Sequence, residues 1–487
     1  MPTFQLTHHQ TEALAKLQAF TREEGSRCFV LRGYAGTGKT TLVGDYVRWL
    51  EKQQVKAVLL ATTGRAAKVL AEKTGREAST IHSCIYQFDE LEGLDAPAGK
   101  GEQLTLQFGV RQQPLYDQEV VYIVDEASMI PNTATTGGQV AKFGSGHLLV
   151  DFLAFTRGQR VVFVGDPCQL PPVSAESFSP ALSPRYLRDE YEVAVRYAEL
   201  FEIVRQDAQS EILELAGRFR ADILKEQYQK WPKIMAPRQQ GAYLHANEQA
   251  LIEAYMPYLQ KRDYPEALMI TNANGHCRRL NHRLRLSLQG HKNLQEGELL
   301  MVVQNSYYVP LSNGDQVVVK SVKPAGKQAG FTFLEVRLQN VNKPEVYQTL
   351  LIRELLYNDF PGLQPDESRR LLIDFDQRMR KEGVKRKSEA YQRAMRTDPY
   401  LNALRAKFGY VITCHKAQGG EWPQVFLNIQ KSVYVQRDNA LYRWFYTALT
   451  RASERLHLND GFWVQGFNQR QPEVAIRQLK QQQRKNQ

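Results

Sequence analysis

Cysteine is scarce in this sequence, and long apolar runs are missing. The 487 residues include five cysteines, at positions 28, 84, 168, 277 and 414, and no two of them form a C-x-x-C pair. This spacing suggests neither a zinc ribbon nor a disulfide framework. No apolar stretch approaches the length that spans a membrane, and the first residues lack the basic and then apolar pattern of a secretory signal. We therefore expect a reducing, cytoplasmic location and no membrane partner.

The charge balance is moderately basic. The chain has 63 Lys and Arg residues against 52 Asp and Glu residues, a formal net charge of +11. This excess favours a polyanionic partner only weakly, because a basic protein with scattered lysines would show it as well. The length predicts more than one domain, and the 43% hydrophobic content is ordinary for globular proteins.

Short apolar runs alternate with helical patterns in two parts of the chain. The first part contains RCFVLR (27–32), KAVLLAT (56–62), VVYIVDE (120–126) and RVVFVGD (160–166). Such runs, rich in Val, Ile and Leu with little alternation, are typical of parallel strands that are covered on both faces. The same alternation of short apolar runs with helical patterns occurs at 267–288 and 408–459. We predict an α/β fold with two parallel-sheet domains.

Segments with other sequence patterns interrupt both of the predicted parallel-sheet domains. Residues 297–357 are β-rich, with a turn signal at 312–315, and predict a small antiparallel barrel. Residues 366–407 are charged and helical in pattern, and we expect them to leave that barrel as a solvated excursion. Near 86–117 the pattern predicts a hairpin with its tip at 95–102. The expected domains are 1–85 with 118–207, an insert at 86–117, 208–296 with 408–470, an insert at 297–407, and a basic polar tail at 471–487.

The segment GYAGTGKT matches the phosphate-binding pattern G-x-x-x-x-G-K-[ST] at Gly33, Gly38, Lys39 and Thr40. It follows a predicted strand and opens a predicted helix, which is the context that the motif requires. Backbone N–H groups and the helix N-terminus would hold the phosphates of ATP. We expect Lys39 to contact the β- and γ-phosphates and Thr40 to bind Mg²⁺. Gly36, Thr37 and Thr41 complete the predicted loop.

Two acids end the predicted strand VVYIVDE. Asp125 is suited to the Mg²⁺ shell, and Glu126 to polarising an attacking water. The plainer alternative is a pair of acids that cap the next helix. With the phosphate loop upstream, the pair favours hydrolysis of ATP with Mg²⁺ as cofactor.

The stretch GDPCQLPPV (165–173) leaves another buried strand in a Pro-rich turn. A turn capped by Asp166 is one explanation. In a phosphate-loop ATPase, however, a Gln after such a strand can sense the γ-phosphate or the attacking water. Gln169 is the candidate for that role.

At this point the sequence resembles the superfamily-one DNA helicases, since GDPCQLPPV is similar to their motif III. The segments LTHHQ (6–10), ATTGRAAKVL (61–70), STIHS (79–83), IVRQ (203–206), GYVITCHKAQGGEW (409–422) and YTALTRA (446–452) resemble the Q motif and motifs Ia, Ib, IV, V and VI. The similarity is to the RecD-like and bacteriophage Dda-like branch, which moves 5′ to 3′ on single-stranded DNA.

The resemblance implies two RecA-like domains, with an SH3-like barrel and charged helices inserted in the second. It implies roles in catalysis for Lys39, Glu126, Gln169, Arg205 and Arg451, with Arg451 as an arginine finger. Gln10 would read adenine, and Gly420 and Glu421 would also lie at the ATP. DNA would be held by Thr62, Thr63, Arg65, Thr80 and His82 in the first lobe, and by Thr271, Asn272, Thr413 and His415 in the second. Phe88 and Phe108 are the candidates for a strand-separating wedge.

Several of these residues have a plainer explanation. Thr7 and Gln10 also form an S/T-x-x-Q capping box, and Arg451 suits the C-terminus of a helix. His82 and His415 could be buried histidines, and either phenylalanine could anchor the base of the hairpin.

The main hypothesis is an ATP-dependent 5′→3′ DNA helicase. We expect it to act as a monomer on single-stranded DNA and duplex junctions, with single-strand-binding, replication or repair proteins as further partners. An RNA helicase, a translocase that does not unwind, and a nucleic-acid-binding protein with an inactive ATPase core are the alternatives.

Overall fold

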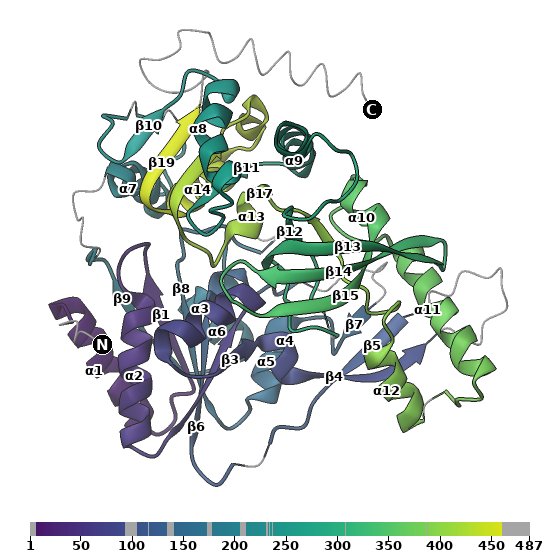
Figure 1. Ribbon diagram of the computed structural model, residues 1–487. Helices are drawn as coiled ribbons and strands as arrows, with labels where there is room; N and C mark the ends of the chain where they lie inside the picture. Colours follow the sequence, from purple (N-terminus) through teal and green to yellow (C-terminus); the bar gives the residue numbers. More distant parts are fainter. Residues whose placement is uncertain are drawn as a thin grey trace. The chain divides into compact units, whose positions relative to one another are not determined.

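The computed structural model (Figure 1) describes residues 6–92, 105–114, 116–133, 141–172, 178–204, 211–229, 232, 234–235, 237–306, 308–386 and 388–459. The chain divides into two compact units. The first comprises Met1–Pro167, Pro171–Gln206 and Leu363–Leu401, and the second comprises Cys168–Leu170, Asp207–Gly362 and Asn402–Gln487. Within the described ranges, no helix has both the length and the apolar character needed to cross a membrane.

A parallel sheet forms the centre of the first unit. In spatial order it contains β3 (Ala78–Thr80), β2 (Lys56–Ala61), β6 (Val120–Asp125), β8 (Arg160–Gly165), β1 (Cys28–Gly33) and β9 (Val195–Leu200). Every neighbouring pair is parallel. The four apolar runs of the first half are therefore confirmed as strands of one sheet.

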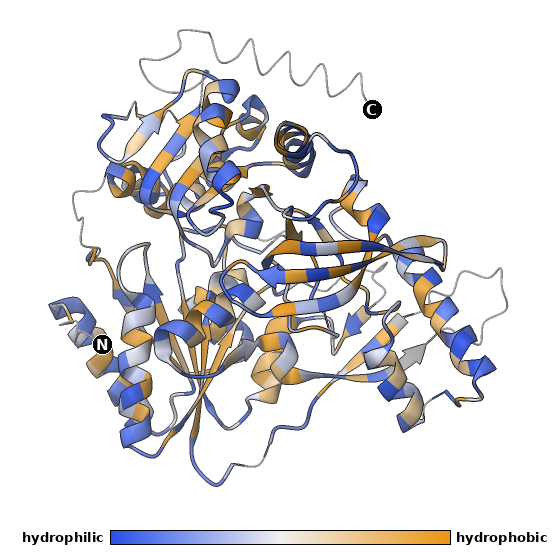
Figure 2. Ribbon diagram, viewed as in Figure 1, coloured by the Kyte–Doolittle hydropathy of each residue, from blue (hydrophilic) through white to orange (hydrophobic). Residues whose placement is uncertain are grey.

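Helices cover both faces of this sheet, as the lack of alternation predicts. Along β6, Val121 and Ile123 enter one hydrophobic core, whereas Val120, Tyr122 and Val124 enter the other. The first core is closed by α1 (His8–Arg22), α2 (Lys39–Lys52) and α3 (Gly64–Thr74), and the second by α4 (Ile81–Ile85), α5 (Leu148–Phe155) and α6 (Pro184–Tyr191). Two short 3₁₀ turns, η1 (Ala127–Met129) and η2 (Pro180–Leu182), follow the strands. Figure 2 shows these strands as apolar along most of their length.

The predicted hairpin is present as β4 (Tyr86–Glu92) and β5 (Thr105–Val110), with β7 (Ala141–Phe143) added in parallel to β5. Two charged helices, α11 (Pro365–Lys381) and α12 (Glu389–Thr397), belong to the same unit. Their buried side chains, including Phe375 and Tyr391, form a core against which Phe88 and Leu106 pack. The excursion predicted from the barrel is thus helical, and its apolar face is buried on the hairpin. The predicted tip at 95–102 and the tail at 471–487 lie outside the described residues.

A second parallel sheet forms the centre of the second unit. It contains, in spatial order, β10 (Ala242–Leu244), β19 (Ala452–Asn459), β18 (Trp422–Asn428), β11 (Ala267–Thr271) and β17 (Val411–Thr413). The helical elements of this part are α7 (Glu211–Leu224), α8 (Glu248–Lys261), α9 (Asn274–Gln289), α13 (Cys414–Ala417), η3 (Lys431–Val435) and α14 (Asp438–Leu449). The strand, turn and helix predicted at 267–288 correspond to β11 and α9.

The β-rich stretch of the second unit forms an antiparallel sheet. Its order is β15 (Val346–Ile352), β14 (Phe331–Asn340), β13 (Gln316–Gln328), β12 (Leu299–Val302) and β16 (Ala406–Phe408), and α10 (Arg353–Tyr357) follows β15. The predicted turn is confirmed: Gly314 has a φ of 92°, and the Asp315 N–H donates to the Ser312 carbonyl over 3.0 Å. Just before β16, Leu404 bridges to Leu351 of β15, so both ends of the sheet are linked.

Candidate functional site

The phosphate loop connects β1 to α2 in the first unit. Gly36 and Gly38 have φ values of 79° and 75°, a left-handed conformation that glycine adopts without strain. A Cβ at Gly33 would lie 2.8 Å from both Lys39 Cγ and Thr37 Oγ1, so that position has no room for a side chain. The Lys39 ammonium donates to the carbonyls of Gly33 (2.7 Å) and Tyr34 (3.1 Å). The loop therefore has the glycine geometry and the lysine that the motif requires.

Gln10 is buried against this loop. Its amide Nε2 donates to the Thr37 carbonyl over 3.0 Å, and its Oε1 accepts from the Thr7 N–H over 3.1 Å. Thr7 Oγ1 in turn accepts from the Gln10 N–H, so the capping box is confirmed. Gln10 thereby ties the start of α1 to the phosphate loop, and its contact with adenine stays a prediction.

Asp125 and Glu126 lie at the carboxyl end of β6, in the same sheet as the phosphate loop. Ligands of parallel α/β sheets bind at this edge. Burial raises the pKa of the Asp125 carboxyl, against the opposing effects of the Glu126 N–H, Lys39 and Lys73. Two nearby cations and a buried carboxylate suit a site for a metal–phosphate complex. Glu126 has a φ of 52°, an uncommon value for a residue with a side chain.

The donor atoms fit magnesium. Asp125 supplies carboxylate oxygens, and Thr40 supplies a hydroxyl from the first turn of α2. Hard oxygen ligands of this kind, completed by phosphate and water, are those that Mg²⁺ prefers.

The predicted DNA contacts of the first unit lie at helix starts. The hydroxyls of Thr63 and Thr80 accept hydrogen bonds from Ala66 N–H and Ser83 N–H and so cap α3 and α4. Thr62 Oγ1 donates to the Glu126 carbonyl over 3.4 Å. Motif Ia is thus bonded to the acid pair, and Arg65 follows on α3. These geometries leave nucleic-acid contact as a prediction.

His82 and the two wedge candidates belong to one aromatic cluster. His82 packs edge-on to Phe143 at 5.4 Å, and burial lowers its pKa. Phe108 stacks on Phe143 at 4.6 Å and meets Phe88 across the strand pair at 5.8 Å. This packing favours the plainer interpretation, in which both phenylalanines anchor the base of the hairpin.

The segment Cys168–Leu170 of the Pro-rich turn is part of the second unit. Arg443 Nη1 donates to the Gln169 carbonyl over 2.9 Å, and Thr447 Oγ1 accepts from the Leu170 N–H over 2.9 Å. Gln418 Nε2 donates to the Leu170 carbonyl over 2.9 Å. Gln169 Oε1 is buried and makes no hydrogen bond to the described residues. A buried amide with an unused acceptor agrees with a sensing role, which stays a prediction.

Arg443 and Thr447 are not singled out by the sequence motifs. They precede Arg451 at intervals of four residues, and residues spaced in this way share one face of a helix. This spacing is the signal that could have identified them.

Arg451 is buried beyond the end of α14. Its guanidinium donates to the carbonyls of Thr447 (3.0 Å) and Gly420 (2.9 Å). The expected interaction with the end of the helix is therefore present, and the finger role stays a prediction. Glu421 is exposed next to Gly420. Arg205 lies outside the described residues.

The predicted DNA contacts of the second unit cluster after β11 and β17. Thr271 and Thr413 are buried at paired strand ends. Asn272 donates to Ser432 Oγ over 3.1 Å and interacts with His276 Nδ1. His415 is the second residue of the short helix α13 (Cys414–Ala417), and burial lowers its pKa.

Comparisons with known proteins agree with this geometry. The family described as AAA domain matches residues 5–231, and the family described as UvrD-like helicase C-terminal domain matches residues 408–459. The ATP-dependent RecD2 DNA helicase of Deinococcus radiodurans is 36% identical over 155 residues, 31% of this chain and 17% of that protein. The ATP-dependent DNA helicase Pif1 of Bdellovibrio bacteriovorus is 32% identical over 174 residues, 35% of this chain and 34% of that protein.

Among solved structures, a Pif1 helicase from Bacteroides in complex with ADP-AlF3 and single-stranded DNA aligns with a TM-score of 0.49 at 15% identity. The alignment covers 99% of this chain and 98% of that chain.

The strand, loop and helix of the first unit, with Asp125 in the same sheet, define an ATP-binding phosphate-loop protein. More particularly, the two family matches and the RecD2 and Pif1 relatives make the chain similar to the RecD and Pif1 branch of the superfamily-one helicases. It spans about a sixth of the RecD2 relative (17%) and about a third of the Pif1 relative (34%).

Proposed function

We propose that this protein is an ATP-driven helicase that moves 5′ to 3′ on single-stranded DNA and separates duplex strands. The observation that carries the proposal is the phosphate loop, with Lys39 inside it and the acids Asp125 and Glu126 at the same edge of the sheet. The family match at 408–459 and the RecD2 and Pif1 relatives support DNA as the substrate and this polarity.

In this proposal the residues of the first unit bind and orient ATP. Lys39 and the loop N–H groups hold the phosphates, and Gln10 positions the loop. Thr40 and Asp125 hold Mg²⁺, which neutralises developing charge on the phosphates when bound. Glu126 accepts a proton from the attacking water. Gln169 senses the γ-phosphate, and Arg205 and Arg451 add positive charge, a contribution of about 10³–10⁵ in rate for such an arginine.

The remaining parts would hold and divide the nucleic acid. Thr62, Thr63, Arg65, Thr80 and His82, and in the second unit Thr271, Asn272, Thr413 and His415, would contact mainly the backbone, because a translocase has to ignore sequence. The antiparallel sheet, whose ends are linked through Leu404, would be an SH3-like barrel. The boundaries predicted for the RecA-like domains, the hairpin and the barrel belong to the same proposal.

Unwinding of matched duplexes with either a 5′ or a 3′ single-stranded tail tests this function. ATP turnover is measured in parallel without nucleic acid, with DNA and with RNA, and a Lys39→Ala protein is the matched control. Separation from the 5′ tail alone, with DNA-stimulated turnover, is the expected result.

The other outcomes separate the alternatives. Stimulated turnover without strand separation identifies a translocase, and stimulation by RNA alone identifies an RNA enzyme. Equal turnover with and without nucleic acid, together with no strand separation, refutes the proposal.

A further inference from the structure

The Pro-rich turn after β8 belongs to the second unit for three residues, Cys168–Leu170, whereas the residues on either side of it belong to the first. Pro167 and Pro171 flank this tripeptide. Proline fixes its own φ and restricts the residue before it to an extended conformation, so the backbone is limited at both ends. The hydrogen bonds that hold Gln169 between these ends come from side chains of the second unit.

One peptide group of the turn is bonded at both of its polar atoms. Its carbonyl, which belongs to Gln169, accepts from Arg443 Nη1 over 2.9 Å, and its N–H, which belongs to Leu170, donates to Thr447 Oγ1 over 2.9 Å. Because a peptide group is planar, any rotation of it would break both bonds. All four residues are buried, so water does not readily replace a lost bond. Two side chains of α14 therefore set the backbone that carries the Gln169 side chain.

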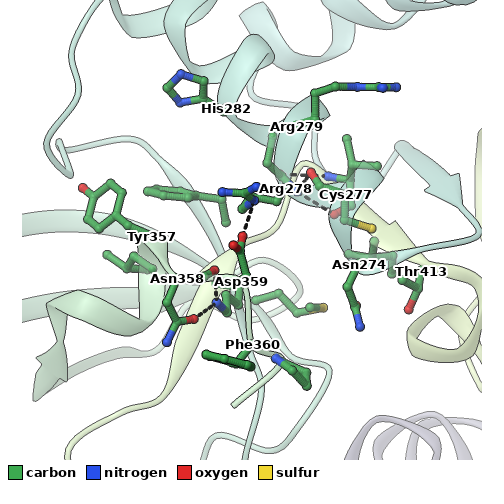
Figure 3. A pocket seen from close by; sticks show the side chains of 18 of the residues that line it. Asn274, Cys277, Arg278, Arg279, His282, Tyr357, Asn358, Asp359, Phe360 and Thr413 are labelled. Carbon is green, nitrogen blue, oxygen red and sulfur yellow. Dashed lines mark hydrogen bonds and ion pairs between the residues drawn. The ribbon is translucent and has the colours of Figure 1, made fainter. Parts of the chain in front are cut away.

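A third hydrogen bond comes from the residue after α13. Gln418 Nε2 donates to the Leu170 carbonyl over 2.9 Å, and α13 is itself joined to α14, because Cys414 Sγ donates to the Trp444 carbonyl over 3.8 Å. At the start of α13, Thr413 lines a cavity of about 490 Å³ (Figure 3), whereas Gln418 is not part of that lining. The three side chains that hold the turn thus come from two helical segments that are bonded to each other.

Thr447 also holds Arg451. The Thr447 carbonyl accepts from Arg451 Nε over 3.0 Å, while its hydroxyl is bonded to Leu170. Arg451 Nη1 makes a second bond, to the Gly420 carbonyl over 2.9 Å. One residue therefore connects the turn that carries Gln169 with Arg451, and it uses a different atom for each.

We propose that Thr447 is a positioning residue for ATP hydrolysis, which keeps the Gln169 turn and Arg451 in fixed positions relative to each other. Arg443 and Gln418 assist it by holding the two carbonyls of the turn. The inference rests on the proposed function, in which Gln169 senses the γ-phosphate and Arg451 adds positive charge. Gln169 Oε1 makes no hydrogen bond to the described residues, so the hydrogen bonds that place this residue act on its backbone.

Thr447→Val tests this role, because it replaces the hydroxyl by a methyl group and keeps the carbonyl that Arg451 uses. Turnover is measured across a range of ATP concentrations, with and without single-stranded oligothymidine. We expect kcat to fall about 10- to 100-fold and the KM for ATP to change less than about threefold, because misplacing a group that acts in the transition state lowers kcat. Thr447→Ser keeps the hydroxyl and should retain most of the wild-type kcat.

Thr349→Val is the matched control. Thr349 is a buried threonine of the antiparallel sheet in the same unit, and its hydroxyl donates to the Leu350 carbonyl over 3.3 Å. This protein should keep the wild-type kcat. Thermal unfolding shows whether each variant is folded. If Thr447→Val does not fold, Gln418→Met, which removes the bond to the Leu170 carbonyl, takes its place in the same measurements.

A double-mutant cycle with Gln169→Ala shows whether Thr447 acts through Gln169. If it does, Gln169→Ala/Thr447→Val turns over ATP no more slowly than Gln169→Ala alone. Multiplication of the two losses overturns the proposal. A wild-type kcat in Thr447→Val, or an equal loss in Thr447→Val and Thr447→Ser, overturns it as well.

Failure of the proposed function can be told apart from failure of this inference. If the wild-type protein hydrolyses ATP but separates no strands, the helicase proposal fails, and the kcat values of the Thr447 variants still decide the positioning role. If the wild-type protein does not hydrolyse ATP, both proposals fail.

Discussion

Among single side chains, Lys39 offers the clearest test of the ATP site. Its ammonium lies inside the phosphate loop, bonded to two carbonyls. We expect Lys39→Ala to reduce ATP turnover to background, because the loop loses its only side-chain cation, and to leave most single-strand binding intact. Turnover is measured by phosphate release and binding by fluorescence anisotropy. Lys16→Ala, an exposed position on α1, is the control. Normal turnover in Lys39→Ala would contradict the assignment.

Arg285 and Glu298 form a buried ion pair in the second unit. Their side chains are 2% and 0% exposed, and the Arg285 guanidinium lies 3.5 Å over the Phe408 ring. Breaking such a pair leaves an uncompensated buried charge, which costs about 3–5 kcal/mol. We expect Arg285→Met to lose about that much stability in urea unfolding and Arg285→Met/Glu298→Gln to lose less. Arg185→Met, which breaks an exposed pair with Asp189, should cost at most about 1 kcal/mol. Equal losses in all three proteins would refute this account.

At the level of elements, a histidine pair links the end of the edge strand β10 to its neighbour β19 in the second sheet. His245 Nε2 lies 3.1 Å from His457 Nδ1, and His457 Nε2 lies 3.3 Å from Gln424 Oε1. Burial, with the adjacent His245 and Arg455, lowers the pKa of His457 to about 4. The folded protein therefore binds this proton less readily than the unfolded chain does.

The stability contributed by neutral His457 is complete above its unfolded pKa of about 6.5 and is lost as the pH falls towards about 4. We expect the urea midpoint of the second unit to fall over this window, and to fall less steeply in His457→Gln. His8→Gln, exposed at the start of α1, should keep the wild-type dependence. The same slope in all three proteins would show that His457 does not titrate in this way.

Elements that depend on local patterns could be predicted from the sequence. The strands β1, β2, β6 and β8 are short apolar runs, and the phosphate loop is fixed by glycines within eight residues. The placement of α11 could not be predicted in this way. Its buried positions Phe375 and Met379 reveal an apolar face, but helical spacing does not say which distant surface covers that face.

The candidate functional site likewise contains residues that the sequence predicts and contacts that it does not predict. Lys39 and Asp125 follow from motifs next to strand ends, where chain-local geometry decides their position. The hydrogen bond from Arg443 to the Gln169 carbonyl joins residues that are 274 positions apart in the chain. Local sequence patterns do not predict a contact between residues so far apart. Position in the hairpin predicts Phe88 and Phe108 as wedge residues. Their packing depends on β7, which follows later in the chain.

For the whole molecule, the net charge of +11 predicts that the proposed nucleic-acid affinity depends on salt. The logarithm of the affinity for single strands should fall linearly with the logarithm of the salt concentration, by about 0.7 for each phosphate that is neutralised. We expect Arg65→Gln, at a predicted DNA contact, to reduce this slope by about 0.7, whereas exposed Lys16→Gln leaves it unchanged. Anisotropy titrations between low and moderate salt measure it. An unchanged slope in Arg65→Gln would exclude a phosphate contact at that residue.

The connectivity of the two units has a consequence for dissecting the protein. The chain passes from one unit to the other after Pro167, Leu170, Gln206, Gly362 and Leu401, so no single cut releases either unit whole. A fragment that ends at Gln206 would lack α11 and α12 and would present Phe88 and Leu106 to water. We expect that fragment to bind a hydrophobic dye and aggregate, and the same fragment with Leu363–Leu401 joined to its end to stay monomeric in light scattering. Exchange of a whole unit between relatives would likewise require several junctions at once.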